Sequence, residues 1–384
     1  MPPLPPRPLR LLIVLPSWVG DAAMATPTLR MIRAALPGVF IGALARPGID
    51  ELLDGSGFFD EVHVARSSGI MGPKFVAAKV RPRRYDTALL LTNSFSTALM
   101  VRIAGVPRRI GYDRDARGLL LTHSIRAPLR ADGSFAPVPA VDYYYTLAER
   151  FLLAPAREGT SPDSLDTRPL TTRPFRAFLE LAVTASQQAA ASALLERAGL
   201  APGQRFAILN PGGNNEAKRW PMERFAALAE HLHQRHGLAI LINGSPGEAT
   251  LVDAIASACA STRPARLSAL GITLGALKGV VAAASIMVTN DTGPRHIAAA
   301  MGVPLVSLFG PTDHRWTTIP TRAGEALILA DPTLPEDQLA NDHPERCAIG
   351  HISLADVVRA CDGLLGRTGR DGGDADHDHS SKHE

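Results

Sequence analysis

Residues Ser285–Thr312 read SIMVTNDTGPRHIAAAMGVPLVSLFGPT, and the rest of the chain repeats the pattern of this stretch. The apolar, β-branched run Ile286–Thr289 predicts a buried strand. The segment HIAAAMG, which ends at Gly302, predicts a helix, and Pro304–Phe309 predicts a second strand. A strand, a helix and another strand form half of a doubly wound α/β unit. Ligands of such units bind at the carboxyl ends of the strands, against helix N-termini.

The turn between this strand and helix has the composition of an anion-binding site. Asp291 or Thr292 can cap the helix, and the backbone N–H groups beyond Asp291 attract negative charge together with the helix dipole. Gly293 has no side chain to block a phosphate, and Arg295 and His296 can add charge or hydrogen bonds. The alternative is an ordinary strand–turn–helix with a good cap, and the spacing alone does not decide between the two.

Short apolar runs alternate with helical segments in both halves of the chain. This alternation predicts an α/β fold with doubly wound parallel sheets and helices on both faces. The segment Ala116–Ala140 is less regular and contains a Pro/Gly-rich loop, Pro128–Pro139. Predicted strands elsewhere are Leu9–Leu15, Val39–Leu44, Glu61–Val64, Thr87–Leu91, Arg108–Gly111, Leu179–Val183, Phe206–Leu209 and Leu238–Ile242.

A chain of 384 residues is long for one domain, and we expect two. The segment Ala154–Pro174 is rich in Pro, Thr, Ser and Arg and is interpreted as the interdomain region. The predicted domains are therefore residues 9–174 and 175–365. A loose, Pro-rich N-terminus (residues 1–8) and a hydrophilic, disordered tail (residues 366–384) flank them. The cleft between two such domains is the default ligand site.

The composition restricts the compartment and the partners. Three cysteines give neither a disulfide framework nor a CxxC pair, which indicates a reducing, cytoplasmic compartment. The net charge is only +3, but residues 1–180 hold 23 Lys and Arg against 16 Asp and Glu, a local net of +7. A basic first half suits an acidic substrate or anionic lipid headgroups, although solvated surface charge explains any individual arginine equally simply. Nothing here predicts a nucleic-acid partner.

The N-terminus imitates a signal peptide, with Arg7 and Arg10 before LLIVLPSWV and an AxA sequence at Ala23–Ala25. Pro16 interrupts the apolar run, which is also short, so we reject that interpretation and expect a buried first strand. No segment reaches the ~18 apolar residues of a membrane helix. We therefore expect a cytoplasmic protein that is peripheral, at most, on the inner face of the cytoplasmic membrane.

Asp21 follows the first predicted strand in the loop PSWVGDAAMATP. A carboxylate in this position can accept a proton from a hydroxyl nucleophile, and such a base contributes about 10²–10⁴ in rate. The simpler interpretation is a helix N-cap.

The loop NPGGNNEAKRWP follows the strand Phe206–Leu209. Its two glycines allow close backbone approach, and Lys218 and Arg219 supply adjacent cations, as a point charge and a fork that suit a pyrophosphate. The loop is not a Walker motif, and no GxGxxG follows the first strand, so a dehydrogenase lacks its fingerprint.

The loop NGSPGE places Glu248 where a carboxylate could hydrogen-bond ribose hydroxyls. The alternative is an acidic residue favoured by a helix N-terminus. We find no dense carboxylate or His/Cys cluster, and we expect no metal and no cofactor. The tail histidines His377, His379 and His383 are interpreted as part of a solvated tail.

Several of these segments, taken in order, resemble the heptosyltransferase family, glycosyltransferase family 9, over about residues 9–365. The similar segments are GDAAMATPTLR, YDTALLLTNSFSTALMVRIAGVPRRIGY, NPGGNNEAKRWP, NGSPGE and TNDTGPRHIAAAMGVPLVSLFGPT. NSFSTAL and AKRWP look more like the second heptosyltransferase than the first. The chain departs from the family pattern at Gly213–Asn215 and at Pro294-Arg295.

The resemblance implies a GT-B fold, with two Rossmann-like domains facing across a cleft. The first domain would take an acidic, lipid-linked lipopolysaccharide core acceptor, and the second would bind ADP-heptose as a substrate. Transfer would be metal-independent and inverting. By position, Asp21 matches the proposed general base and Lys218 the diphosphate-binding lysine. The residues Asp291, Thr292, Gly293 and His296 match the donor motif, and Glu248 falls in the adenosine-contacting segment.

Two other classes of function remain open at this point. One is a related GT-B glycosyltransferase with a different nucleotide-sugar donor or acceptor. The other is a non-catalytic nucleotide- or sugar-binding protein, for which the presence of Asp21 and Lys218 has no evident use.

Overall fold

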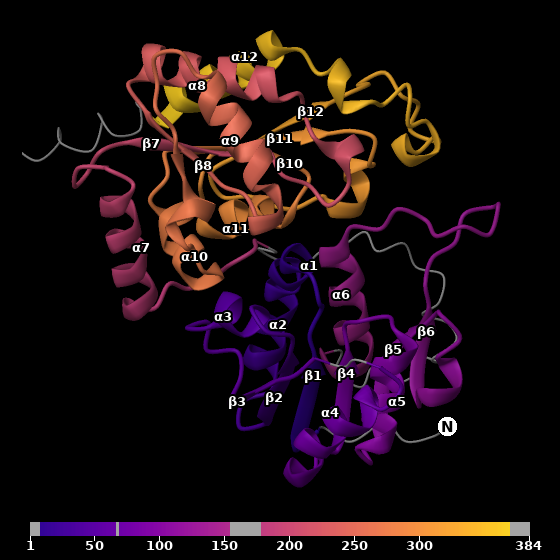
Figure 1. Ribbon diagram of the computed structural model, residues 1–384. Coiled ribbons are helices and arrows are strands. Elements are labelled where there is room, and N and C mark those ends of the chain that lie inside the picture. The colour runs from indigo at the N-terminus through magenta and orange to yellow at the C-terminus, as the bar shows by residue number, and fades with distance from the viewer. Residues whose placement is uncertain (1–7, 67–68, 154–177, 369–384) are drawn as a thin grey trace, which may run out of the picture. The chain divides into compact units, whose positions relative to one another are not determined.

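The computed structural model describes residues 8–66, 69–153 and 178–368 and forms two compact units (Figure 1). The first unit holds Met1–Gln187 with His314–Pro320, and the second holds Gln188–Asp313 with Thr321–Glu384. The predicted boundary at residue 174 lies outside the described residues. Among the described residues the first unit extends to Gln187, and the chain re-enters it for residues 314–320, which local sequence patterns do not reveal.

The first unit contains a six-stranded, all-parallel sheet in the order β3-β2-β1-β4-β5-β6. Leu11–Val14 of β1 are buried because this strand is central and is covered on both faces. The strands are β1 Arg10–Val14, β2 Phe40–Ala45, β3 Glu61–Val64, β4 Thr87–Leu90, β5 Arg108–Asp113 and β6 His123–Arg126. The helices are α1 Val19–Met24, α2 Thr26–Ala35, α3 Ile49–Leu53, α4 Gly72–Val80, α5 Phe95–Ile103 and α6 Ala140–Ala148, which continues as a π-helical turn, Glu149–Leu153.

The second unit contains another six-stranded parallel sheet, in the order β12-β11-β10-β7-β8-β9. Its strands are β7 Phe206–Asn210, β8 Ala239–Ile242, β9 Ala265–Arg266, β10 Ile286–Asn290, β11 Leu305–Phe309 and β12 Glu325–Leu329. Its helices are α7 Ala185–Arg197, which begins in the first unit, α8 Met222–His236, α9 Ala249–Ala258, α10 Leu274–Ala282, α11 Gly293–Met301 and α12 Leu354–Thr368.

Both sheets have the same topology, in which the first strand of the unit lies beside the fourth. The strand order therefore reverses between β1 and β4 in the first unit and between β7 and β10 in the second. The carboxyl ends of parallel strands share one edge, and ligands of doubly wound sheets bind where the order reverses. The predicted α/β, doubly wound fold of two Rossmann-like units is confirmed, and each unit has one such switch point.

Some predicted elements differ from the structure. Strand β6 lies inside the less regular segment Ala116–Ala140, where no strand was predicted, and Leu179–Val183, predicted as a strand, is not one. Leu179 and Leu181 are buried within the first unit, where the backbone N–H of Glu180 donates to Thr26 Oγ1 of α2 at 3.1 Å. The alternating apolar pattern therefore reflects packing of an extended segment on a helix rather than strand pairing.

The predicted loose N-terminus and disordered tail lie largely outside the described residues, because residues 1–7 and 369–384 are not described. The tail was predicted to begin at residue 366, but α12 continues to Thr368. Val357, Cys361, Leu364 and Leu365 place α12 in the core that β7, β10, β11 and α8 also form. Within the described residues, no helix is both long enough and apolar enough to cross a membrane.

Candidate functional site

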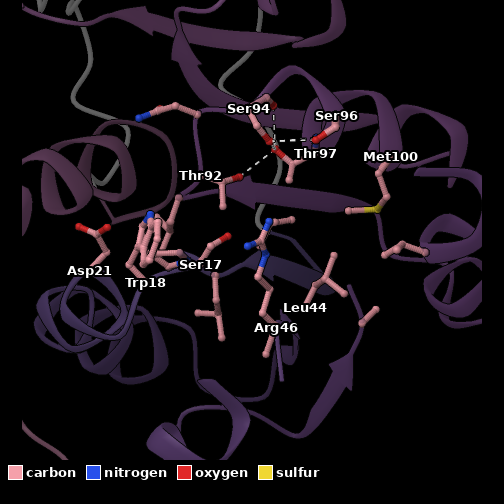
Figure 2. A pocket seen from close by; sticks show the side chains of 18 of the residues that line it. Ser17, Trp18, Asp21, Leu44, Arg46, Thr92, Ser94, Ser96, Thr97 and Met100 are labelled. Atoms are coloured by element: carbon pink, nitrogen blue, oxygen red, sulfur yellow. Dashed lines mark hydrogen bonds between the residues drawn. The ribbon is translucent and has the colours of Figure 1, made fainter. Parts of the chain in front are cut away.

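A cavity of about 320 Å³ lies at the switch point of the first unit (Figure 2). The segments that follow β1, β2 and β4 form its walls, with help from α4, α5 and α6. Its charged residues are Asp21 and Arg46, and hydroxyl groups of Ser17, Thr92, Ser94, Ser96, Thr97 and Tyr144 surround the space. A pocket with many hydroxyl groups and few charges suits a saccharide.

Asp21 is the third residue of α1, and Trp18 holds the N-cap position. The alternative interpretation of Asp21 as a helix N-cap is therefore wrong. The hydroxyl of Tyr144 in α6 donates a hydrogen bond to the Asp21 carboxylate. Burial, followed by the charge of Asp21, raises the pKa of Tyr144 well above its ordinary value, so the hydroxyl stays protonated and keeps donating. This contact orients the carboxylate beside the cavity.

A second polar group on the cavity wall, Asn93, is held by buried neighbours. Arg117 Nη2 donates to Asn93 Oδ1 at 3.2 Å, and Tyr143 Oη donates to the same oxygen at 3.1 Å. The Tyr143 ring stacks on Tyr112 with ring centroids 3.6 Å apart. Burial lowers the pKa of the Arg117 guanidinium to about 10, which still leaves it charged near neutral pH. The loop after β4 is thus fixed rather than loose.

Sequence reasoning assigned no role to Trp18, Arg46 or Tyr144, all of which line this cavity. Trp18 is 69% exposed although it is a large aromatic residue. Trp18 and Arg46 directly follow β1 and β2, so their positions after predicted strands were the available signal. Tyr144 lies within a helix that comes about 120 residues later, and nothing in its local sequence connects it to Asp21.

In the second unit, Lys218 and Asp291 lie together although 73 positions separate them. Lys218 Nζ is 3.6 Å from Asp291 Oδ2, and both side chains are largely buried. Lys218 comes from the loop after β7, and Asp291 follows β10. The pair therefore spans the second switch point, next to the N-terminus of α11.

The first turn of α11 is open to an anion. Thr292 holds the N-cap position, but its side chain does not cap the helix. Its Oγ1 accepts from Asn210 Nδ2 at 2.9 Å instead. Gly293 and Pro294 then begin the helix, so the first turn presents backbone N–H groups without a side-chain cap, which favours a bound negative group.

His296 lies one turn further along α11 and is buried. Its Nδ1 has no hydrogen-bond partner among the described residues. Burial, followed by the charge of Arg295, lowers the pKa of His296 well below its ordinary value. The imidazole is therefore neutral, and it offers a hydrogen bond rather than a charge.

Three asparagines at the ends of adjacent strands brace these loops. Asn243 Nδ2 donates to Asn210 Oδ1 at 2.6 Å, which leaves Asn210 Nδ2 to reach Thr292. Asn290 Nδ2 donates to the carbonyl oxygens of Pro211 at 2.7 Å and Gly212 at 3.1 Å. Sequence reasoning assigned no role to these asparagines. The signal was their recurrence as the residue at or just after the end of each strand.

Glu248 joins the loops after β7 and β8. Its Oε1 accepts from the Gly213 N–H at 2.7 Å, and its Oε2 accepts from the N–H and hydroxyl of Ser245, both at 2.8 Å. Burial raises the pKa of Glu248, but these hydrogen bonds outweigh it and leave the pKa below its ordinary value. A Cβ on Gly212 would lie 2.4 Å from Oε1, so glycine is required there by this contact.

Arg219 closes the same loop. Its Nε and Nη2 donate to the carbonyl oxygen of Gly213 at 3.1 and 2.9 Å. Two of the donors that suggested a pyrophosphate fork therefore hold the Gly-rich turn in place. All but one of the predicted site residues belong to the second unit, in the loops that follow its strands or in the first turn of α11. They are Lys218, Arg219, Glu248, Asp291, Thr292, Gly293 and His296. The exception, Asp21, belongs to the first unit.

Arg295, which was expected to add charge or hydrogen bonds at this turn, makes ion pairs within its own unit. Its side chain is fully buried, and Nε and Nη2 lie 2.7 and 3.1 Å from the two carboxylate oxygens of Glu325 in β12. Nη1 lies 3.8 Å from Asp291 Oδ1. Arg295 thus ties α11 to the edge of the sheet and supports Asp291 from behind.

Comparison with known proteins shows similarity over nearly the whole chain. Lipooligosaccharide heptosyltransferase 2 of Haemophilus influenzae is 28% identical over 331 residues, which cover 84% of this chain and 88% of the relative. A glycosyl transferase family 9 structure from Veillonella parvula superposes with a TM-score of 0.77 at 20% identity and covers 93% of this chain and 97% of its own. The structure of E. coli ADP-heptose LPS heptosyltransferase II gives a TM-score of 0.75 at 25% identity, with 94% and 99% covered.

The profile of glycosyltransferase family 9 (heptosyltransferase) matches residues 76–338. This range includes the loop after β4 in the first unit and, in the second, all the switch-point loops with Lys218, Glu248 and Asp291. The chain therefore belongs to glycosyltransferase family 9, the heptosyltransferase family.

Proposed function

We propose that this protein is an inverting heptosyltransferase that moves heptose from ADP-heptose to the lipopolysaccharide inner core, as the names of the heptosyltransferase 2 relatives suggest. The observation that carries the proposal is that the two sheets, which share one topology, carry complementary catalytic groups at their switch points. The switch point of one unit holds an oriented carboxylate, Asp21, and that of the other holds Lys218 at an uncapped helix N-terminus.

The first unit supplies the acceptor side of the reaction. Asp21 accepts the proton of the acceptor hydroxyl as that oxygen attacks the anomeric carbon. The Tyr144 hydrogen bond holds the carboxylate at the rim of the cavity. The hydroxyl groups of the cavity suit the hydroxyl groups of a sugar, and exposed Trp18 offers a flat apolar surface for a sugar ring.

The second unit supplies the donor side. As the new glycosidic bond forms, the bond between the anomeric carbon and the diphosphate oxygen breaks, and ADP leaves with the bonding electron pair. Lys218 and the N–H groups of the first turn of α11 stabilise the negative charge that develops on this leaving group. Neutral His296 offers a hydrogen bond to the diphosphate and adds no charge of its own. Glu248 holds together the loops after β7 and β8, which would contact the adenosine.

An acidic, lipid-linked acceptor at the membrane is the finer part of the proposal. Arg46 is the cation on the wall of the first-unit cavity, where it can meet an acidic sugar. Exposed residues of α4 (Lys74, Phe75 and Lys79) and of the turn just before it (Ile70 and Met71) form a surface that we call the α4 surface. Large apolar side chains interleaved with lysines are typical of peripheral attachment to anionic lipid, in this case the inner face of the cytoplasmic membrane.

The first test is calorimetric binding of ADP, UDP and GDP without added divalent metal, followed by turnover with ADP-heptose and ADP-glucose on a core acceptor. ADP selectivity together with transfer of heptose supports the proposal. A preference for UDP or GDP, or turnover only with another sugar, replaces it with a glycosyltransferase of different donor. Binding of ADP-heptose without transfer to any core acceptor favours a non-catalytic binding protein.

A further inference from the structure

A cluster of three metal-binding side chains lies on the second unit, away from its switch-point loops. His231 and His236 belong to α8, and Asp362 belongs to α12. The two imidazole Nε2 atoms lie 2.9 and 2.6 Å from the same oxygen, Asp362 Oδ1. One ligand atom from each of the three residues lies within 4.8 Å of the others. Sequence reasoning found no such cluster, although HLHQRH carries three histidines within six residues.

The position of the cluster separates it from the transfer reaction. Helix α8 begins beside the loop after β7 and runs to the opposite edge of the sheet, where β8 begins. At 1.5 Å per residue, His231 and His236 lie about 14 and 21 Å along the axis from Met222. A ligand held there cannot contact a diphosphate at the N-terminus of α11.

The chemistry of the three groups suits a zinc ion. Zinc binds imidazole nitrogen at about 2.0–2.1 Å and carboxylate oxygen at about 2.0–2.2 Å, usually with four ligands. Both Nε2 atoms face the same carboxylate oxygen, so an ion between the three groups would bind Nε2 of each ring in the tautomer that carries its hydrogen on Nδ1.

The cluster is also accessible. The side chains of His231, His236 and Asp362 are 28%, 20% and 39% exposed, so an ion can enter and a water molecule can complete its coordination. Partial burial limits competition from bulk water. We propose that His231, His236 and Asp362 form a structural zinc site that fastens the C-terminal helix α12 to α8.

The consequence is stabilisation of the second unit. Helix α12 contributes Val357, Cys361, Leu364 and Leu365 to the core, so its attachment matters to that core. A ligand that binds only the folded state stabilises it in proportion to the logarithm of its concentration over its dissociation constant. At about one hundred times the dissociation constant, zinc should raise the unfolding temperature of a unit of this size by about 5 °C or more.

The test is a zinc titration of the full chain against a chelating indicator, with melting curves taken with and without zinc. The variants are His231→Gln and Asp362→Asn, and the matched control is His233→Gln on the same helix, whose imidazole contacts the Leu238 carbonyl instead. The tail histidines remain in every protein and cancel from the comparison. We expect the first two variants to lose one zinc equivalent and the zinc-induced melting shift, and the control to keep both.

A purely structural role of the two hydrogen bonds would give a different result. In that case His231→Gln and Asp362→Asn would melt lower without zinc but would bind as many zinc ions as the wild type, with the same zinc-induced shift. That outcome overturns the proposal and assigns the zinc to the tail or to another surface. Because the readouts are binding and melting, the result is independent of heptose transfer.

Discussion

Lys218 Nζ lies 3.6 Å from Asp291 Oδ2, and this contact joins the loop after β7 to the loop after β10 at the switch point of the second unit. The lysine approaches from a Gly-rich turn that Glu248 and Arg219 hold in place. The aspartate is supported from behind by Arg295. The cation is thus positioned before any donor binds, and a diphosphate at the helix N-terminus would share it with Asp291.

Replacement of Lys218 by methionine should weaken ADP binding. The variant removes the charge-assisted hydrogen bond to the diphosphate but keeps most of the aliphatic packing. We expect a loss of about 10–100-fold in affinity, which corresponds to the 1.5–3 kcal/mol of one charged hydrogen bond. Calorimetry with ADP measures it, with Lys79→Met in the first unit as the control. Unchanged affinity in Lys218→Met would place the diphosphate elsewhere.

Replacement of Asp21 by asparagine should lower kcat by about 10²–10⁴ and leave ADP affinity unchanged, because the base acts only on the acceptor hydroxyl. Tyr144→Phe removes the hydrogen bond that orients the carboxylate, and we expect a smaller fall of about tenfold in kcat. Steady-state kinetics with saturating donor measures kcat for both variants and distinguishes the large fall from the small one. Full activity in Asp21→Asn would exclude this carboxylate as the base.

The buried pair of Arg295 and Glu325 makes a prediction about stability. Arg295→Met leaves Glu325 as a buried, unpaired carboxylate, which should destabilise the protein by about 3–5 kcal/mol. The double variant Arg295→Met/Glu325→Leu removes both charges and should recover most of that loss, since apolar packing often replaces a buried ion pair at little cost. Urea unfolding of the two variants and the wild type measures the coupling. Additive losses in the double variant would contradict it.

The sequence was sufficient to predict the fold class and the candidate residues of the switch-point loops. Apolar runs and glycine-rich turns are local signals, and the central strands β1, β4, β7 and β10 were all predicted to within about one residue. Strands β6 and β9 lie at sheet edges, and β9 has only two residues, so it leaves no periodicity to detect.

The contacts that position the candidate residues could not be predicted in the same way. Tyr144 reaches Asp21 across 123 positions, and Arg295 finds Glu325 on β12, a strand that was not predicted. Arginine usually lies at the surface, and only the fold shows that Arg295 is buried and that a partner compensates its burial. The same holds for Asp362, which the packing of α12 on α8 brings to two histidines.

The neutral state of His296 predicts a pH dependence of stability. Its pKa is well below the ordinary value of 6.5 in the folded protein, so the unfolded chain binds a proton first as the pH falls. The folded state therefore loses about 1.4 kcal/mol per pH unit below pH ~6.5 from this residue, and the loss is absent above it. His296→Gln has no imidazole to protonate, so its free energy of unfolding does not fall for this reason. The difference in free energy of unfolding between wild type and variant should therefore become smaller as the pH is lowered from 7.5 to 5.5. Urea unfolding at both pH values measures the difference, and a constant gap would contradict burial of the imidazole.

The α4 surface should bind anionic vesicles. Ile70, in the turn before α4, is 98% exposed and Phe75 of α4 is 69% exposed, and Lys74 and Lys79 are further exposed residues of α4. Each lysine near an anionic surface contributes about 1 kcal/mol, and burying an aromatic or aliphatic side chain contributes about 1.5–3 kcal/mol. The variant Ile70→Ser/Phe75→Ser should therefore reduce sedimentation with phosphatidylglycerol vesicles at least tenfold. Leu119→Ser, which alters an equally exposed leucine outside the surface, should bind as the wild type does.

Since salt screens the lysines but not the apolar contacts, the wild type should retain part of its binding at 0.5 M salt. Equal binding of the double variant and the wild type would show that another surface, or the acceptor alone, brings the protein to the membrane.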